Sequence, residues 1–272
     1  MSHAVETTSR EAVLVEDPGH RNIMGIPVLE PVPTPTVPYE LTDPFILVHE
    51  GRFRPSDMVG KDTRHPHRGF DNLWYAVRGA VSTGHTTGPG GSTERARLEE
   101  GSLLWLRAGR GVWHAEALGS DEADHGEGDS EFRGVLFWVN LAREDKQAEP
   151  SAMVLDRDRI PVRQESDATV RVLVGEGSPV VLGTPALILD VELLDGGQVT
   201  TPLPAEFQAF AYLLDGQAAF GANTRQAGPA QLVVLGPGEQ LTVTDAAPGT
   251  RFLVMAGRPY RETPVFNGPF VD

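Results

Sequence analysis

The chain has 272 residues, of which 40% are hydrophobic and 22% are charged, and this balance excludes a wholly disordered protein. The formal net charge of −15 argues against direct binding to the phosphates of nucleic acids. There is no cysteine, so disulfides and thiolate ligands are excluded, and any metal site must use histidine and carboxylate side chains.

The N-terminal sequence and the hydropathy of the chain predict the cellular location of the protein. The opening stretch, MSHAVETTSREAVLVE, lacks the basic and apolar regions of a signal peptide. No apolar run approaches the roughly 20 residues that a membrane helix needs. We therefore expect a cytoplasmic protein without membrane contact.

Short apolar runs, separated by 30 glycines and 22 prolines, dominate the sequence. They predict strands at Phe45–His49, Leu73–Val77, Ser102–Leu106, Gly134–Leu141, Val170–Val174, Ala186–Leu194, Phe207–Leu214, Gln231–Leu235 and Arg251–Ala256. Amphipathic helical patterns over a dozen residues are absent. Many short strands between turn signals predict an all-β sandwich or barrel.

Three segments are predicted to lie outside this framework. Pro31–Pro38 is proline-rich and is expected to run extended over the barrel as a spacer. Thr86–Glu94 is predicted to be a glycine-rich turn, and Gly119–Glu131 is an acidic, glycine-rich loop with too few apolar residues to pack.

A faint internal repeat predicts two lobes. Tyr75–Gly79 resembles Tyr212–Gly216, because each places an aromatic strand end before a turn glycine. A further apolar strand and a glycine follow in both halves. The polar stretch near residues 145–165 separates them, so we predict an N-terminal domain over residues 1–150 and a C-terminal domain over residues 151–272.

The eight histidines all lie within the first 125 residues. Three of them and one glutamate form two pairs in which a single residue separates the two members. His65 and His67 project to the same face of an extended strand, because residues i and i+2 point the same way. His114 and Glu116 repeat this spacing. By contrast, His49 is expected to be hydrogen-bonded within the fold and His85 to lie at the surface.

Two such pairs facing each other in a barrel would supply three imidazole nitrogens and one carboxylate. This donor set suits Fe(II), Mn, Ni, Cu or Zn and leaves positions open on an octahedral ion. Aligning the repeat places Pro202, Pro204, Val243 and Asp245 where the first half has its candidate ligands. One carboxylate does not make a site, so the metal is expected in the N-terminal lobe only.

Four motifs resemble those of the pirin family of the cupin superfamily. They are His65–Phe70 (HPHRGF), Trp105–Glu116 (WLRAGRGVWHAE), Leu136–Leu141 (LFWVNL) and Asn267–Val271 (NGPFV). The resemblance runs from about residue 20 to the C-terminus. It implies an all-β bicupin, two tandem jelly-roll-like barrels facing each other, with one metal held in the first barrel.

The resemblance also implies roles for particular residues. It assigns the metal, iron first and otherwise Mn, Ni, Cu, Co or Zn, to His65, His67, His114 and Glu116. Asp71 stands where the family usually has glutamate, and the resemblance implies that it orients a ligand histidine from behind. The turn after Gly79 and the acidic loop after Glu116 are longer than is usual in the family, and both are expected to influence which substrate enters.

The family implies a dioxygenase of the quercetin 2,3-dioxygenase type, with a small aromatic substrate and dioxygen as reactants. Glu116 would act as ligand or as base, and the aromatic side chains of Phe70, Trp74, Trp105 and Trp113 are candidates for the pocket wall. The alternatives are an iron-dependent, redox-responsive regulator that binds a transcription factor or metabolic enzyme, and a tailoring enzyme of a biosynthetic pathway. A monomer is compatible with all three.

Overall fold

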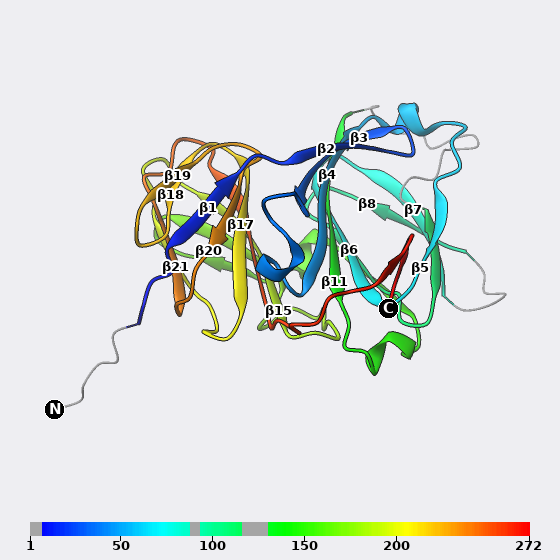
Figure 1. Ribbon diagram of the computed structural model, residues 1–272. Helices are drawn as coiled ribbons and strands as arrows, with labels where there is room; N and C mark the ends of the chain where they lie inside the picture. The colour runs from blue at the N-terminus through cyan, green and yellow to red at the C-terminus, as the bar shows by residue number, and fades with distance from the viewer. Residues whose placement is uncertain (1–6, 88–92, 116–129) are drawn as a thin grey trace.

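The computed structural model describes residues 7–87, 93–115 and 130–272, which form two β-barrels lying side by side (Figure 1). Within these ranges the helices are four short 3₁₀ turns. They are η1 (Tyr39–Leu41), η2 (Pro55–Met58), η3 (Asp145–Gln147) and η4 (Arg157–Arg159). The prediction of an all-β protein is confirmed.

The first barrel is built from a seven-stranded and a four-stranded sheet. The large sheet has the order β12 (Ser151–Leu155), β9 (Leu103–Arg107), β6 (Phe70–Arg78), β11 (Phe132–Asn140), β4 (Phe45–Phe53), β3 (Ile26–Val32) and β2 (Gly19–Ile23). The small sheet has the order β5 (Arg64–His67), β10 (Val112–Ala115), β7 (Val81–Thr87) and β8 (Glu94–Leu98).

The second barrel repeats this arrangement. Its large sheet is β1 (Ala12–Glu16), β20 (Leu232–Leu235), β17 (Gln208–Asp215), β22 (Arg251–Gly257), β15 (Ala186–Leu193), β14 (Ala168–Val174) and β13 (Val162–Gln164). Its small sheet is β16 (Val199–Pro202), β21 (Gln240–Thr244), β18 (Ala218–Phe220) and β19 (Arg225–Ala227). A hairpin of β23 (Phe266–Asn267) and β24 (Phe270–Val271) returns to the first barrel and pairs Phe270 with Arg68.

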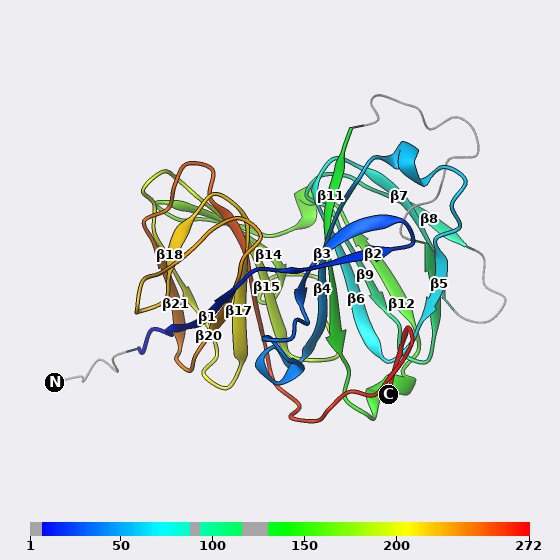
Figure 2. The ribbon, with the colours of Figure 1, turned by 45° about the horizontal axis from the view of Figure 1, so that its top comes forward.

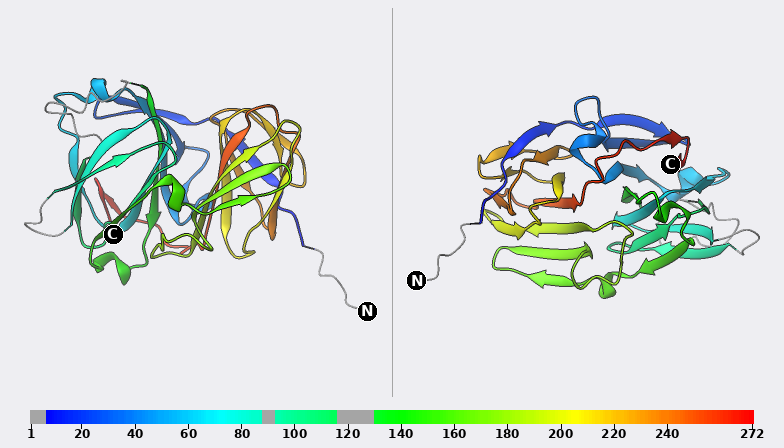
Figure 3. Two further views of the ribbon diagram at one scale, coloured as in Figure 1. Left: turned by 180° about the vertical axis from the view of Figure 1, so that it is seen from behind. Right: turned by 60° about the horizontal axis from the view of Figure 1, so that its bottom comes forward.

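The two large sheets pack face to face and share one hydrophobic core (Figure 3). On β6, Leu73, Tyr75 and Val77 belong to this shared core, whereas Trp74 and Ala76 point into the first barrel. Both faces of the central strands are therefore buried, which explains why their sequences are continuous apolar runs.

The shared core contains two buried charge clusters that repeat each other. The hydroxyl of Tyr75 donates to Asp190 at 2.7 Å, and the hydroxyl of Tyr212 donates to Glu50 at 2.8 Å. Each carboxylate also accepts from an arginine of its own lobe, Arg251 or Arg133. The two tyrosines are the pair that the internal repeat aligns, so the repeat reflects two lobes of one architecture.

Strand β1 begins the chain but lies in the second barrel, whereas β2 and β3 lie in the first (Figure 2). Strand β12 lies just beyond residue 150 and pairs with β9 of the first barrel. A domain boundary at residue 150 stays a prediction, since strands on both sides of it contribute to the neighbouring sheet.

The proline-rich segment differs from its prediction. Pro31 and Val32 end β3, and the backbones of Thr34 and Val37 then hydrogen-bond to each other in a turn. Val32 and Val37 are fully buried in the shared core, because the two valines offer apolar area that an exposed arm would leave in water. The segment is a packed turn and not an extended spacer.

No helix in the described part of the chain is long and apolar enough to cross a membrane. The predicted turn at Thr86–Glu94 joins β7 to β8, although residues 88–92 lie outside the described residues. Most of the acidic loop, residues 119–129, also lies outside them.

Candidate metal centre

Three histidines meet on the inner face of the four-stranded sheet of the first barrel. Antiparallel pairing of β5 with β10 places His65 opposite His114 and His67 opposite Val112. Because strand side chains alternate, His65, His67 and His114 all project to the same side. Their potential ligand atoms lie within 4.8 Å of one another, and the Nε2 atoms of His65 and His114 are 3.1 Å apart.

Backbone carbonyls fix the ring orientation of two of these histidines. Nδ1 of His65 donates to the carbonyl of Thr63 at 2.7 Å, and Nδ1 of His67 donates to the carbonyl of Pro269 at 3.4 Å. Each bond places the proton on Nδ1 and leaves the lone pair on Nε2. Nε2 of His67 is buried and has no hydrogen-bond partner among the described residues.

Burial keeps His67 and His114 neutral. Burial and the neighbouring His65 lower the pKa of His67 to about 3. Burial, together with His67 and His65, holds the pKa of His114 well below its usual value. Neutral imidazoles with free Nε2 lone pairs are the form that binds a cation.

These observations fit a resident metal ion. A cation between the three rings would satisfy the orphaned Nε2 of His67 and replace the contact between the Nε2 atoms of His65 and His114. Three imidazoles suit first-row transition metals. Glu116, the fourth predicted ligand, lies outside the described residues, and its role stays a prediction.

A cavity of about 450 Å³ opens beside the histidines, between the two sheets of the first barrel. His65 and His67 line it from the small sheet, and its walls are otherwise mostly apolar. A volume of this size matches the pockets that hold small organic molecules. The three histidines therefore lie at the wall of a space large enough for a substrate.

Aromatic side chains surround His67. Trp138 on β11 lines the cavity, its ring lies 4.9 Å from that of His67, and it stacks on Phe70 at 4.2 Å. Trp74 also lines the cavity, whereas Phe70, which was expected in the pocket wall too, is not among the lining residues. Trp138 was not among the residues predicted for the pocket, although alternation along Gly134–Leu141 puts Gly134, Leu136 and Trp138 on one face of the strand.

The C-terminal hairpin forms another part of the cavity wall. Phe266, Gly268 and Pro269 line it, and Val271 is buried against Phe70. The hairpin ends beside β5 in Figure 1. An ion pair of 2.8 Å between Arg68 and Asp272 fastens it there. The two motifs HPHRGF and NGPFV, far apart in sequence, therefore build one site.

Comparison with known proteins agrees with this architecture. The family model described as pirin matches residues 29–139, and the pirin C-terminal cupin domain matches residues 188–272. A pirin-like protein from Solanum lycopersicum is 34% identical over 235 residues, covering 84% of this chain and 75% of that protein. The chain belongs to the pirin family.

Solved structures with the same fold include a protein named as an enzyme and a pirin bound to a metal ion. A quercetin 2,3-dioxygenase from Acinetobacter baumannii superposes with a TM-score of 0.79 at 24% identity, covering 96% of this chain and 91% of that one. A bacterial pirin from Escherichia coli in complex with nickel(II) has a TM-score of 0.67 at 14% identity, with coverages of 90% and 99%. At these identities the likeness shows the two-barrel fold alone.

Two aromatic residues predicted for the pocket wall of this pirin lie elsewhere. Trp113 alternates with His114 on β10, so it points outward and is 51% exposed. Trp105 faces the second lobe from β9, where its indole N–H donates to Asp71 at 3.1 Å. Neither is among the residues that line the cavity, which corrects both assignments.

Asp71 does not contact a ligand histidine. It alternates with Phe70 on β6 and faces the second lobe, where it accepts hydrogen bonds from Trp105, Arg107 and the backbone N–H of Gly183. Burial raises the pKa of Asp71, while Arg107 and these hydrogen bonds oppose the rise. In this pirin Asp71 therefore connects the lobes, and the expectation that it orients a histidine is corrected.

The two other histidines of the barrel have separate environments. His85 lies opposite His114 in the pairing of β7 with β10 and is buried, because it occupies the inward face of β7. The expectation that it lies at the surface is wrong. His49 is buried on β4 and hydrogen-bonds to Glu30 at 2.6 Å, as its predicted structural role requires.

In the second barrel, the strand pair β16–β21 corresponds to β5–β10 of the first barrel and carries valine, leucine and threonine side chains instead of histidines. Pairing of β16 with β21 places Val199 opposite Val243 and Thr201 opposite Leu241. The register thus corrects the sequence alignment, which had put Pro202 and Pro204 at these positions. Because this barrel is filled by its own hydrophobic core and contains no histidine, the histidine cluster belongs to the first barrel.

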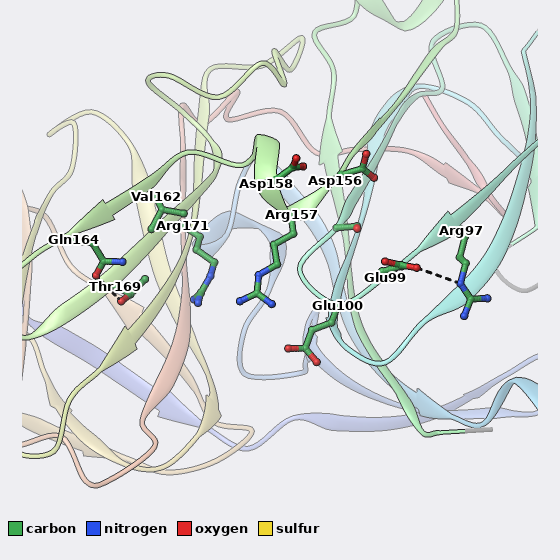
Figure 4. Close-up of a pocket in the computed structure, with 11 residues that line it drawn as sticks. Arg97, Glu99, Glu100, Asp156, Arg157, Asp158, Val162, Gln164, Thr169 and Arg171 are labelled. Carbon is green, nitrogen blue, oxygen red and sulfur yellow. Dashed lines mark hydrogen bonds and ion pairs between the residues drawn. The ribbon is translucent and has the colours of Figure 1, made fainter. Parts of the chain in front are cut away.

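A second hollow, of about 1020 Å³, lies between the lobes and away from the histidines (Figure 4). Its side chains carry charges of both signs, and Arg157 lies between Arg171 and Glu100 in the close-up. Arg97 pairs with Glu99 at 3.6 Å and Arg171 with Glu192 at 3.2 Å. Because acidic and basic side chains both line this hollow, it does not create an electrostatic potential of a single sign.

Proposed function

We propose that this pirin is a metal-dependent dioxygenase of the quercetin 2,3-dioxygenase type, acting on a flavonol or a related aromatic enol. The observation that carries the proposal is a cavity of about 450 Å³ whose wall includes two of the three clustered histidines. The structural neighbours with that enzyme name support it.

The protein residues would hold the metal, with iron as the first choice and Mn, Ni, Cu, Co or Zn as alternatives. His65, His67 and His114 would present Nε2 lone pairs, and Glu116 would complete the set. When bound, the metal would lower the pKa of an enol hydroxyl and activate the substrate towards dioxygen.

The remaining contributions would come from protein side chains. Glu116 would accept the proton of the substrate's 3-hydroxyl on a carboxylate oxygen. Trp74 and Trp138 would hold the planar ring system between apolar surfaces, and the apolar wall would exclude water from the site. The overall change adds dioxygen to the flavonol, opens its central ring and releases one carbon atom as carbon monoxide.

Oxygen consumption with quercetin tests the proposal directly. Iron-loaded protein at neutral pH is expected to remove the flavonol absorbance and to consume one dioxygen per flavonol. The metal-free protein and the His67→Ala variant are the controls and are expected to be inactive. Absence of turnover with iron, manganese, nickel, copper and cobalt would contradict the proposed reaction.

A regulatory function is the second candidate, because the curated relatives are named only as pirins and their names state no reaction. In that case the oxidation state of iron would change the charge at the histidines and thereby the affinity for a protein partner. Binding that differs between the oxidised and reduced iron forms would support this function. A partner that binds both forms equally would remove its mechanism.

A further inference from the structure

The cavity has a second polar group in the sheet that faces the metal centre. Arg21 on β2, Glu30 on β3 and His49 on β4 line the wall formed by the large sheet, whereas His65 and His67 line the wall formed by the small sheet. Apolar side chains and glycines make up most of the remaining wall. Glu30 and His49 are buried, and buried polar side chains in such a wall need a reason.

The hydrogen bonds of this group orient the ring of His49. Oε2 of Glu30 lies 2.6 Å from Nε2 of His49, and Nε of Arg21 donates to Oε1 at 2.7 Å. A carboxylate paired with arginine accepts from Nε2–H, which leaves the other ring nitrogen for a different partner. No hydrogen bond joins Nδ1 of His49 to any residue that the structure describes, and His49 lines the cavity.

The strand register gives the position of His49 along β4 relative to Trp138. Trp138, whose ring contacts that of His67, pairs with Leu47 on β4. His49 lies two residues farther along β4 on the same face, a step of roughly 7 Å. A molecule that chelates the metal beside Trp138 and extends along β4 past Leu47 by about two fused rings would lie beside His49 in this cavity.

We propose that His49, held by Glu30, is a specificity-determining residue that binds a hydroxyl group on the part of the substrate remote from the metal. The substrate hydroxyl donates to Nδ1 of His49, and the carboxylate of Glu30, which accepts from Nε2–H, keeps Nδ1 as the acceptor. The preferred substrate is an aromatic enol that carries an additional hydroxyl. This inference rests on the proposed function, because it assigns the substrate class of that same cavity.

Comparing the binding of two flavonols distinguishes the contribution of the metal centre from that of His49. Both quercetin and 3-hydroxyflavone carry the metal-chelating 3-hydroxyl and its neighbouring carbonyl, but 3-hydroxyflavone lacks the other hydroxyls. Affinities are measured by titration calorimetry without oxygen on protein loaded with zinc, so no turnover occurs. We expect the wild-type protein to bind quercetin about tenfold more tightly than 3-hydroxyflavone, as one hydrogen bond to a buried ring implies.

Variants of His49 isolate its contribution. His49→Gln keeps a nitrogen near the Nε2 position for Glu30 but removes Nδ1, so the preference for quercetin is expected to fall below about twofold with 3-hydroxyflavone affinity unchanged. His49→Asn keeps a polar atom near the Nδ1 position and is expected to retain part of the preference. His20→Gln, an exposed histidine on β2, is the matched control and is expected to bind as the wild type does. Zinc content and thermal unfolding confirm that each variant is folded.

The outcomes distinguish this inference from the proposed function. A folded His49→Gln variant that keeps the full preference for quercetin overturns the role of His49. A wild-type protein that binds both flavonols equally also overturns it and leaves the dioxygenase proposal standing. A wild-type protein that binds neither flavonol contradicts the proposed function and this inference with it.

Discussion

At the scale of single residues, the ability of the three histidines to bind a metal depends on which ring nitrogen of each imidazole carries the proton. The carbonyls of Thr63 and Pro269 accept from Nδ1 of His65 and His67, which directs both Nε2 atoms to one point. In the absence of metal, the Nε2 atom of His67 is a buried polar atom that no residue in the described part of the chain satisfies. Such an atom costs about 1–3 kcal/mol, which a bound cation would recover.

Replacing His67 is expected to abolish stoichiometric metal binding. His67→Ala removes a nitrogen that has no partner among the residues described, while the ring contact of His65 with His114 is retained. Elemental analysis of the purified variant should find far less than one metal per chain. His20→Ala is the control and should retain the wild-type content. A His67→Ala variant with a full equivalent of metal would show that the ligands are assigned wrongly.

The stability of the metal-free protein is expected to depend on pH below neutrality. His67 stays neutral in the folded state down to a pKa of about 3, whereas the unfolded chain takes up its proton near pH 6.5. The free energy of unfolding should therefore fall as the pH drops from about 6.5 towards 3. Between pH 7 and pH 5 the loss from His67 is about 2 kcal/mol.

Urea unfolding in the presence of a chelator measures this dependence. The His67→Gln variant lacks the titrating ring and should lose less stability over the same interval. An equally steep loss in that variant would mean that other groups cause the pH dependence.

At the scale of elements, the site is made by the approach of the C-terminal hairpin to the loop between β5 and β6. Gly69 has a φ of +91°, and a Cβ atom there would lie 1.8 Å from the carbonyl oxygen of Val271. Lys146 donates to the carbonyl of Gly69 at 2.9 Å and fixes the loop from the other side. The absence of a side chain at residue 69 is what lets the hairpin cover the cavity and reach His67.

Gly69→Ala is expected to displace the hairpin. The variant combines a left-handed backbone with a steric overlap against the main chain, and a loss of about 2–4 kcal/mol in the free energy of unfolding is expected. Metal affinity should fall too, because Pro269 would no longer orient His67. Gly60→Ala is the matched control, since Gly60 also has a positive φ of +76° but open space around it.

Thermal unfolding and metal titration of the two glycine variants give the comparison. Gly60→Ala should lose only the backbone cost, about 1 kcal/mol, and keep its metal affinity. Equal losses in both variants would show that the contact with Val271 is unimportant.

At the scale of the whole molecule, the shared core joins the lobes into one cooperative unit. Phe45 of the first lobe packs edge-on against Phe210 of the second at 5.3 Å between ring centroids. Glu50 and Arg133 of the first lobe and Tyr212 of the second form one buried hydrogen-bonded cluster. Neither large sheet can leave the other without exposing apolar area and buried charge.

Removing one inter-lobe hydroxyl is expected to destabilise both lobes together. Tyr212→Phe takes a hydrogen bond from the buried carboxylate of Glu50 and should lower the free energy of unfolding by about 1–3 kcal/mol. Calorimetry should show one transition at a lower temperature. Val181→Ala, at a side chain that is 71% exposed, is the control and should change stability little. Two separate transitions would contradict cooperative lobes.

Much of the fold could be predicted from the sequence because the large sheets are buried on both faces. All nine predicted strands belong to these two sheets, where apolar runs such as Leu73–Val77 face a core on either side. In the small sheets only the extended segments at His65–His67 and His114 were expected, and the other strands were missed, because most of them are short and one face meets solvent. The segment Val81–Thr87 (VSTGHTT) reads as a turn by composition, yet it forms β7 and buries His85.

The sequence by itself determined the all-β class, the two-lobed repeat and the placement of His65, His67 and His114 on common faces, because each depends on the local period of a strand or on a pattern of neighbours. Only the tertiary structure decided which sheet face meets the second lobe. Asp71 and Trp105 lie on that face and therefore do not contribute to the metal site. It also brought Glu30, His49 and Trp138 to the cavity. Those positions follow from pairing between strands distant in sequence, which no local pattern specifies.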